Sequence, residues 1–92
     1  MGQKRRPKPK RLAEKLREIR LRLNLSQEQL AERLSDVPSP PDAGLISRIE
    51  SDQREPSLLI LLAYARLAGV STDVLIDDAL DLPARVPGRK RF

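Results

Sequence analysis

The sequence predicts an all-α fold of five short helices, on three observations. Near the start, Leu12, Leu16, Ile19 and Leu23 recur at the spacing of one helix face, the pattern of an amphipathic helix. Residues that start and stop helices then alternate along the chain at intervals of a short helix. No segment between them shows the convincing alternation of apolar and polar residues expected of a half-buried strand.

The first two helices are predicted over residues 12–23 and about 27–35. Asn24 follows the first stretch, and asparagine is one of the few residues that tolerate the left-handed conformation at a helix end. Ser26 and Gln29 are spaced as a capping box, in which each side chain bonds the backbone of the other residue. The sequence therefore marks both the end of the first helix and the start of the second.

The third helix is predicted over about 40–50. Ser39 is suited to cap its start, and Pro40 and Pro41 would occupy the first turn, where no N–H donor is needed. The apolar residues of this stretch share one face. A second face collects small and polar residues, namely Ala43, Gly44, Ser47, Arg48 and Ser51.

Capping residues also define the last two helices. Ser57 can cap a fourth helix, which Gly69 stops because glycine readily adopts the left-handed conformation. A fifth helix is predicted to begin at Ser71 or Thr72 and to stop before Pro83.

The net charge of +5 is unevenly distributed. Residues 1–11 carry six bases and no acid, and residues 85–92 carry four bases and no acid. Residues 12–84 hold the other eight bases and all 13 acids, a net charge of −5. We therefore predict a basic disordered arm over 1–11, a helical domain over 12–82 and a basic tail over 83–92. The bases of the arm are Lys4, Arg5, Arg6, Lys8, Lys10 and Arg11.

Composition excludes several classes of protein. Cysteine and histidine are both absent, which removes disulfide scaffolds, thiolate and imidazole metal sites, and catalysis by Ser-His-Asp or Cys-His arrangements. No apolar run is long enough to cross a membrane, and the basic start is not followed by the apolar stretch of a secretory signal. We therefore expect a cytoplasmic protein that is not an enzyme, with no cofactor, metal ion or membrane partner.

Two short helices joined by a turn, the second with a polar outward face, form a helix-turn-helix. The residues from Leu16 to Ala31 resemble the opening of Cro/CI-type (XRE) DNA-binding domains. So do Ile46–Glu50, the junction Glu55–Leu58 and the segment Leu67–Ser71. This resemblance covers about residues 12–80. It implies a compact five-helix, lambda-repressor-like domain whose third helix enters the major groove of double-stranded DNA.

The resemblance also implies roles for individual side chains. Arg20 matches an arginine that forms a structural ion pair with Glu50, and a guanidinium suits that role because it bonds a carboxylate through two donors. Gln27 matches a glutamine whose amide reaches a DNA phosphate; its alternative role is that of a solvated surface residue. The implied phosphate contacts together are Ser26, Gln27, Ser51 and Arg54.

The family's base-reading positions fall on Ala43, Gly44, Ser47 and Arg48. Arg48 can hold a guanine through two hydrogen bonds, a contact worth about 1–3 kcal/mol of discrimination. The alternatives for Arg48 are a solvated charge and an ion pair with an acid on a neighbouring turn. Ala43 and Gly44 have no hydrogen-bonding side chain, so they would touch a thymine methyl or allow close approach of the backbone.

Two departures from the family pattern concern this interface. The connection over residues 35–41 is longer than the usual turn. The loop after the third helix reads Ser51, Asp52 and Gln53, where the family often has a base, glycine and lysine, and Arg54 alone keeps its charge there. The basic arm can supply the missing attraction, because neutralised phosphates release counterions. Its alternative role is that of a solvated tail.

The fourth helix carries more apolar residues than a monomer core needs. By the family pattern, Leu58 and Leu61 face the core. The surplus residues Leu59 and Ala63, with Ile60 or Leu67, then predict a partner surface. A homodimer through the fourth and fifth helices would place two third helices about 34–36 Å apart on DNA. The alternative is an apolar patch on a monomer.

Three acids, Asp77, Asp78 and Asp81, cluster near the end of the predicted fifth helix. They lack the glycine turn and ligand spacing of a calcium loop. A solvated acidic face is therefore predicted there, pointing away from DNA.

Together these features predict a bacterial-type transcriptional regulator that binds double-stranded DNA at the nucleoid as a homodimer. The alternative is an antitoxin-like or adaptor module that binds another protein through the surface of the fourth and fifth helices.

Overall fold

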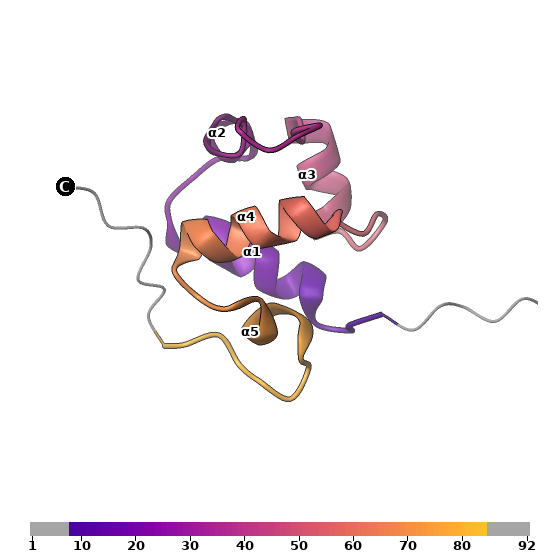
Figure 1. Ribbon diagram of the computed structural model, residues 1–92, viewed down its shortest axis with the longest axis vertical. Helices are drawn as coiled ribbons and strands as arrows, with labels where there is room; N and C mark the ends of the chain where they lie inside the picture. The colour runs from indigo at the N-terminus through magenta and orange to yellow at the C-terminus, as the bar shows by residue number, and fades with distance from the viewer. Residues whose placement is uncertain (1–7, 85–92) are drawn as a thin grey trace, which may run out of the picture.

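The computed structural model describes residues 8–84, which form five α-helices and no strand. The helices are α1 (Leu12–Arg22), α2 (Gln27–Arg33), α3 (Ala43–Glu50), α4 (Leu58–Ala68) and α5 (Thr72–Ile76). In Figure 1, α2 and α3 lie together at one end, α1 and α4 occupy the middle and α5 lies at the other end. The predicted all-α class is confirmed. Lys4, Arg5, Arg6 and the tail from residue 85 onward lie outside the described residues.

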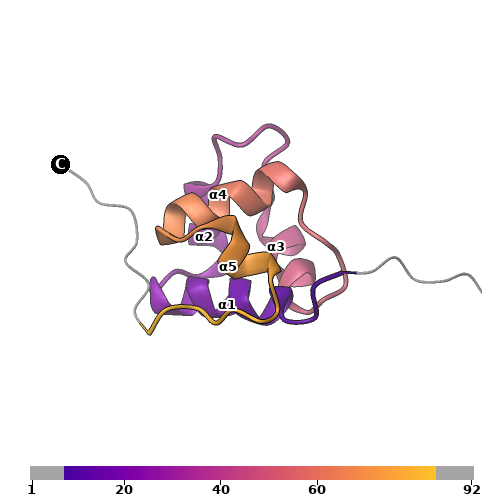
Figure 2. The same cartoon turned by 60° about the horizontal axis from the view of Figure 1, so that its bottom comes forward.

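A single apolar core joins the five helices. The stripe predicted on α1 is buried at Leu12, Leu16 and Ile19, and Leu23 packs against its edge. α1 contacts both α3 and α5, while α4 also contacts α5. Figure 2 shows α5 lying against α1, so that α1 runs beneath much of the domain.

Two of the predicted N-caps, Ser26 and Ser57, are present, whereas the Ser71 side chain makes no capping hydrogen bond at the start of α5. The Ser26 side chain accepts the N–H of Gln29 at 3.0 Å, and the Gln29 side chain accepts the N–H of Ser26 at 2.8 Å. The Ser57 hydroxyl accepts an N–H in the first turn of α4, and Gly69 ends that helix with φ of 75°. Asn24 is also left-handed, with φ of 60°. These local contacts set the bounds of the helices nearest to them.

The predicted start of α3 is wrong, because the helix begins at Ala43 rather than near residue 40. Asp42 is the N-cap residue, and its carboxylate accepts the N–H of Leu45 at 2.8 Å. Ser39, the expected cap, instead has φ of 51°. A residue before proline is driven out of the helical region, and Ser39 and Pro40 each precede a proline. The connection is therefore longer still, and α3 shorter, than the sequence predicted.

Two other helices end earlier than predicted. α2 stops at Arg33 because its last turn tightens, with the N–H of Ser35 bonding the carbonyl of Glu32 at 3.3 Å. α5 stops at Ile76 rather than near Pro83. Beyond Ile76 the backbone carbonyls turn toward a lysine of α1 instead of continuing a helix.

That lysine is Lys15, which is 2% exposed. Its ammonium donates to the carbonyls of Val74, Asp77 and Leu80 at 2.7, 3.0 and 2.7 Å. All three ammonium hydrogens are thereby used, which is how a lysine charge is accommodated in a buried place. Lys15 therefore fixes the end of α5 and the segment after it against α1.

The apolar side of α4 differs from the family pattern. Leu58, expected in the core, is 83% exposed, whereas Ile60, one of the residues expected to be surplus to the core, is 4% exposed. Ser57 caps the helix directly before Leu58, so Leu58 stands at the first position of α4. The face that reaches the core consists of Ile60, Leu61, Tyr64, Ala65 and Ala68.

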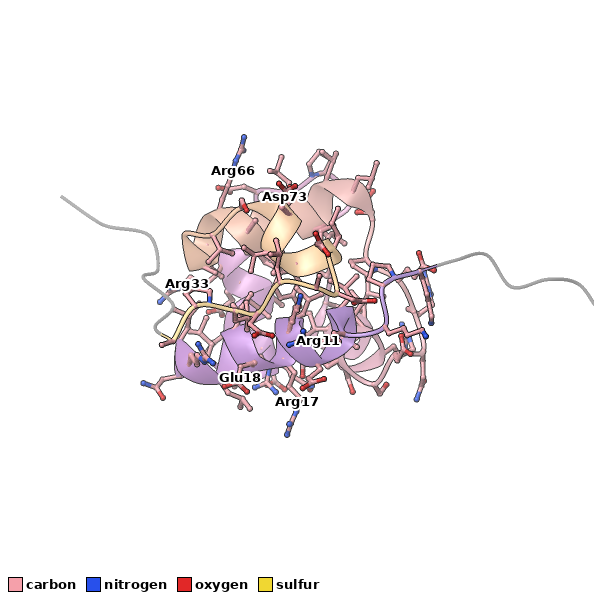
Figure 3. The ribbon with its side chains drawn as sticks, turned by 90° about the horizontal axis from the view of Figure 1, so that it is seen from below. Arg11, Arg17, Glu18, Arg33, Arg66 and Asp73 are labelled. Atoms are coloured by element: carbon pink, nitrogen blue, oxygen red, sulfur yellow. The ribbon has the colours of Figure 1, made fainter. Side chains whose placement is uncertain are left out.

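The chain entering α1 lies against the segment that follows α5. The carboxylate of Asp78 accepts the backbone N–H groups of Lys10 and Arg11 at 2.9 and 3.0 Å, and these bonds lower the pKa of Asp78. The Arg11 guanidinium pairs with Asp81 at 2.7 Å. Figure 3 shows Arg11 at the start of α1, next to this segment. Residues 8–11 of the predicted arm thus contact the domain. The cluster of Asp77, Asp78 and Asp81, predicted to be a solvated acidic face, instead binds Lys10 and Arg11 through two of its acids.

Replacing Asp78 by asparagine is expected to lower the free energy of unfolding at neutral pH and to matter less in acid. The pKa of Asp78 is lower in the folded protein than in the unfolded chain. Its stabilisation is therefore present above the unfolded pKa of about 4 and is lost as the pH falls through the folded value. Urea unfolding at neutral pH and in strong acid measures this. Asp36→Asn is the control, since Asp36 is exposed with no hydrogen bond to the described residues; equal losses at both pH values would contradict the expectation.

Candidate nucleic-acid interface

One side of α3 is open to solvent. Ile46 and Ile49 are buried on the inner side, at 0% and 1% exposure. Three of the four predicted base-contacting residues, Gly44, Ser47 and Arg48, are exposed, and Ala43 is half-buried. The structure therefore gathers the four residues on one outward surface, which is called the reading face below: Ala43, Gly44, Ser47 and Arg48.

The guanidinium of Arg48 lies above the first turn of α3. A Cβ atom placed on Gly44 would be 3.9 Å from Arg48 Nη1 and 3.5 Å from Asp42 Oδ1, both ordinary contacts. Within residues 8–84, no ion pair or hydrogen bond engages the Arg48 guanidinium. Of the alternatives for this residue, the structure favours the solvated charge over the internal ion pair. The packing around Gly44 also leaves room for a side chain, so the fold itself does not require glycine there.

The structure brings Arg20 and Glu50 together. Arg20 Nε and Nη2 donate to the two oxygens of Glu50 at 2.7 and 2.9 Å, and Nη1 donates to the carbonyl of Leu25 at 2.9 Å. The side chains are 11% and 5% exposed. The bonds to Glu50 raise the pKa of Arg20 above its ordinary value. This two-pronged contact ties the end of α3 to α1 and thereby orients the reading face.

Gln27 also contacts this ion pair. Its amide Nε2 donates to Glu50 Oε1 at 3.3 Å, and the side chain is partly buried. One N–H of the amide is thus directed inward, which leaves the second N–H for an outside acceptor. Gln27 is not the fully solvated residue of the alternative interpretation.

Tyr64 is completely buried in the same part of the core. Its hydroxyl is the one buried side-chain polar atom of residues 8–84 without a hydrogen-bond partner. Burial raises the pKa of Tyr64, and the charge of Glu50 adds to this while that of Arg20 opposes it. The tyrosine therefore stays neutral, and it serves mainly to fill the core.

The other predicted phosphate contacts, Ser26, Ser51 and Arg54, differ in whether their polar groups are already bonded within the domain. Ser26 is exposed, and its oxygen already accepts the capping bond of α2. The Ser51 hydroxyl donates to the carbonyls of Ser47 and Arg48 at 3.0 and 3.3 Å, so its hydrogen is used at the end of α3. Arg54 is exposed. Its guanidinium is the positive group of the loop formed by residues 51–54.

Lys8 reaches the same loop from the start of the chain. Its ammonium lies 3.0 Å from Asp52 Oδ1, with the two side chains 31% and 59% exposed. Asp52 is left-handed, with φ of 64°. The structure therefore places Lys8, a base of the predicted arm, beside Asp52, the acid of this loop.

A groove opens between α4 and the long connection from α2 to α3. Figure 2 shows this connection projecting next to α4. The groove measures about 260 Å³. The predicted partner residues Leu59, Ala63 and Leu67 line it on the α4 side, and Leu59 is 52% exposed. The other lining residues are Arg33, Leu34, Asp36, Val37, Pro38, Leu62 and Arg66.

Within residues 8–84, no group of acidic side chains is arranged to hold a metal ion. None of the helices in that range has the length and apolar character needed to cross a membrane. Three surface features of the described chain lie on or near the helix-turn-helix: the reading face, the loop 51–54 with Lys8, and the groove beside α4.

A family model described as a helix-turn-helix domain matches residues 11–79. The chain belongs to this helix-turn-helix family. The match covers α1 to α5 and agrees with the resemblance to Cro/CI-type domains. Membership of this family suggests a DNA-binding regulator, without indicating which DNA it binds. Domains of this family are typically not enzymes. A search of curated proteins found no match to the chain.

Sequence reasoning missed three contacts of this helix-turn-helix domain. Lys15 lies three residues after Leu12 and so falls on the same helix face as the apolar stripe, and a charge at such a position is a signal for a buried partner. Nothing in the sequence indicated that Asp78 would bind the backbone before α1. The pair of Lys8 with Asp52 joins residues 44 positions apart, so no local pattern predicts it.

Proposed function

We propose that this protein is a sequence-specific regulator of transcription that binds double-stranded DNA with the reading face of α3 in the major groove. The observation that carries the proposal is the state of Arg48, which is exposed on the reading face with no ion pair inside the described domain. A free guanidinium has the donors to bind the O6 and N7 atoms of a guanine. Ser47 adds a hydroxyl on the same face.

The neighbouring residues support close contact with DNA. Gly44 has no positive φ and has space for a Cβ atom, so neither its backbone conformation nor its packing requires glycine, whereas a close approach to DNA would. Ala43 offers a methyl group to a thymine methyl. Contacts to phosphates come from Arg54, Ser26 and the outward N–H of Gln27, while Ser51 contributes through its place at the helix end. Such contacts set register and do not read sequence.

The basic arm is proposed to add attraction that does not depend on sequence. Its bases account for more positive charge than the loop 51–54 retains. Arg11 is committed to Asp81 and to two carbonyls of the domain, so this residue anchors the arm. Lys8 is paired with Asp52. Lys4, Arg5, Arg6 and Lys10 remain as candidates for the electrostatic contact.

A homodimer is proposed through the groove beside α4. An exposed apolar surface at Leu59, Ala63 and Leu67 favours burial against a partner. The rim holds both signs of charge, with Arg33 and Arg66 against Asp36. Figure 3 shows Arg66 extending away from the helices. A symmetric contact between two copies needs such mixed charge, because each surface meets its own counterpart.

Selection from random duplex DNA tests regulator and dimer together. We expect an enriched, near-palindromic site whose half-sites are about 34–36 Å apart. Arg48→Ala should relax preference at one base position per half-site, with about 1–3 kcal/mol of discrimination lost. Arg17→Ala is the matched control, because Arg17 is an exposed arginine on α1 rather than on α3, and Figure 3 shows its side chain extending away from the helix. The absence of any enriched motif would exclude sequence-specific reading, and a single half-site would exclude the dimer.

The groove also favours a second candidate, an antitoxin-like or adaptor module in which another protein occupies it. The net negative charge of residues 12–84 is consistent with this alternative. The two candidates differ in their salt dependence. A regulator loses DNA affinity steeply as salt is added, whereas an adaptor with a stoichiometric protein partner shows no salt-dependent DNA binding of its own.

A further inference from the structure

The loop 51–54 presents an acid where the proposed interface meets DNA. Asp52 directly follows the exposed side of α3 and is 59% exposed at its side chain. Two proposed phosphate contacts lie close to it in the sequence: Ser51 directly precedes Asp52, and Arg54 follows two positions later. A carboxylate in that place repels phosphates, and the repulsion acts over about 10 Å at moderate salt. An uncovered Asp52 would therefore oppose the contacts proposed for its neighbours.

Lys8 covers this acid from a distant part of the chain. Its ammonium is 3.0 Å from Asp52 Oδ1, and both residues line the same shallow hollow with Arg54. The ammonium of Lys8 offsets the carboxylate of Asp52, so that Arg54 is the uncompensated charge within residues 51–54. Glu55 lines the same hollow and has a contact of its own, so the charge that Lys8 neutralises in the loop is that of Asp52.

The backbone that follows Lys8 is anchored to the segment after α5. Asp78 accepts the N–H groups of Lys10 and Arg11, and Arg11 pairs with Asp81. These contacts anchor the backbone two and three residues after Lys8. A lysine on a short, tethered segment is kept near Asp52 at a smaller entropic cost than one on a free chain.

We infer that Lys8 is a positioning residue for DNA binding, which neutralises Asp52 so that the loop 51–54 can approach the phosphate backbone. The inference rests on the proposed DNA-binding function and deepens it. It assigns the start of the chain a defined place in the interface, in addition to its general positive charge. An exposed ion pair contributes little to folding, so the consequence of the pair should appear in DNA binding.

A double-mutant cycle tests this with Lys8→Ala, Asp52→Asn and the double variant. Asparagine suits position 52 because it tolerates the left-handed conformation. Binding to a mixed-sequence duplex DNA is followed by fluorescence anisotropy at low salt. Lys8→Ala should weaken binding by about threefold to tenfold. Asp52→Asn should recover most of that loss in the Lys8→Ala background and should change binding much less in the wild-type background.

Lys10→Ala is the matched control. It removes the same charge from the same segment, but the Lys10 side chain makes no hydrogen bond or ion pair with the described residues. Asp52→Asn should therefore improve binding by no more in the Lys10→Ala background than it does in the wild type. Urea unfolding should show that all variants keep the wild-type free energy of unfolding within about 0.5 kcal/mol.

The outcomes separate this inference from the proposed function. If the wild type binds duplex DNA and the effects of Lys8→Ala and Asp52→Asn are additive, Lys8 is an ordinary charge and the inference is wrong, while the proposed function stands. If the wild type shows no salt-dependent binding to duplex DNA, both are wrong. A recovery specific to Lys8→Ala supports the inference.

Discussion

Replacing Arg20 by methionine is expected to lower the free energy of unfolding by about 3–5 kcal/mol. The change leaves the Glu50 carboxylate, 5% exposed, without its two charged hydrogen bonds. A buried charge without a partner is one of the few single changes with so large an effect. Urea unfolding followed by the helical circular dichroism signal measures the loss, and adding Glu50→Gln to Arg20→Met should recover part of it.

Arg17→Met is the control for this experiment, since it makes the same substitution on the same helix at an exposed position. The control should stay within about 0.5 kcal/mol of the wild type. If Arg20→Met itself lost less than about 1 kcal/mol, the pair would behave like an exposed salt bridge and its structural role would be refuted. Should Arg20→Met fail to fold, Arg20→Lys keeps the charge with fewer donors and should give a smaller, measurable loss.

Replacing Lys15 by methionine is expected to cost about 2–4 kcal/mol of unfolding free energy. Methionine has a similar length and fills the same space, but the carbonyls of Val74, Asp77 and Leu80 lose their common donor. The effect should be local as well as global. Hydrogen exchange should become faster in residues 72–82, where the ammonium holds the chain, and change less in α2 and α3.

Lys10→Met provides the comparison for Lys15, because it makes the same change at an exposed lysine. Its free energy of unfolding should remain within about 0.5 kcal/mol of the wild type. Equal stability of Lys15→Met and the wild type would show that water satisfies the three carbonyls just as well. Lys15→Arg should be intermediate, because a planar guanidinium matches three converging carbonyls less well than an ammonium.

Both substitutions act on contacts between distant parts of the chain, and both bear on the proposed interface. The pair of Arg20 with Glu50 sets how α3 is held against α1. The bonds of Lys15 hold the segment that contains Asp78. That acid in turn positions the backbone that carries Lys8. Stability and the shape of the surface proposed to face DNA are therefore coupled in this domain.

The features predicted correctly from the sequence are local. The capping box of Ser26 and Gln29, the cap at Ser57 and the stop at Gly69 each depend on residues within one turn of one another. The α1 stripe is also local, because helical spacing alone places its residues on one face. Residue types at short separation are enough to determine such contacts.

The candidate site was predictable only in part. The outward position of Gly44, Ser47 and Arg48 follows from the apolar residues between them. The contact of Gln27 with Glu50 does not, because it depends on how α2 packs against α3. The start of α3 was missed because two residues that each precede a proline compete with a capping signal at Ser39, and steric exclusion from the helical region prevailed.

By itself, the sequence determined an all-α helix-turn-helix domain, most of its caps and the face of α3 that points outward. Only the tertiary structure decided where α5 ends, which side of α4 is buried and which acids are neutralised. The physical reason is that these outcomes depend on charges and carbonyls brought together across the fold. Lys15 bonds α5 and the segment after it across 59 to 65 positions of the chain, and Lys8 bonds Asp52 across 44. Contacts at such separations exist only once the helices have packed.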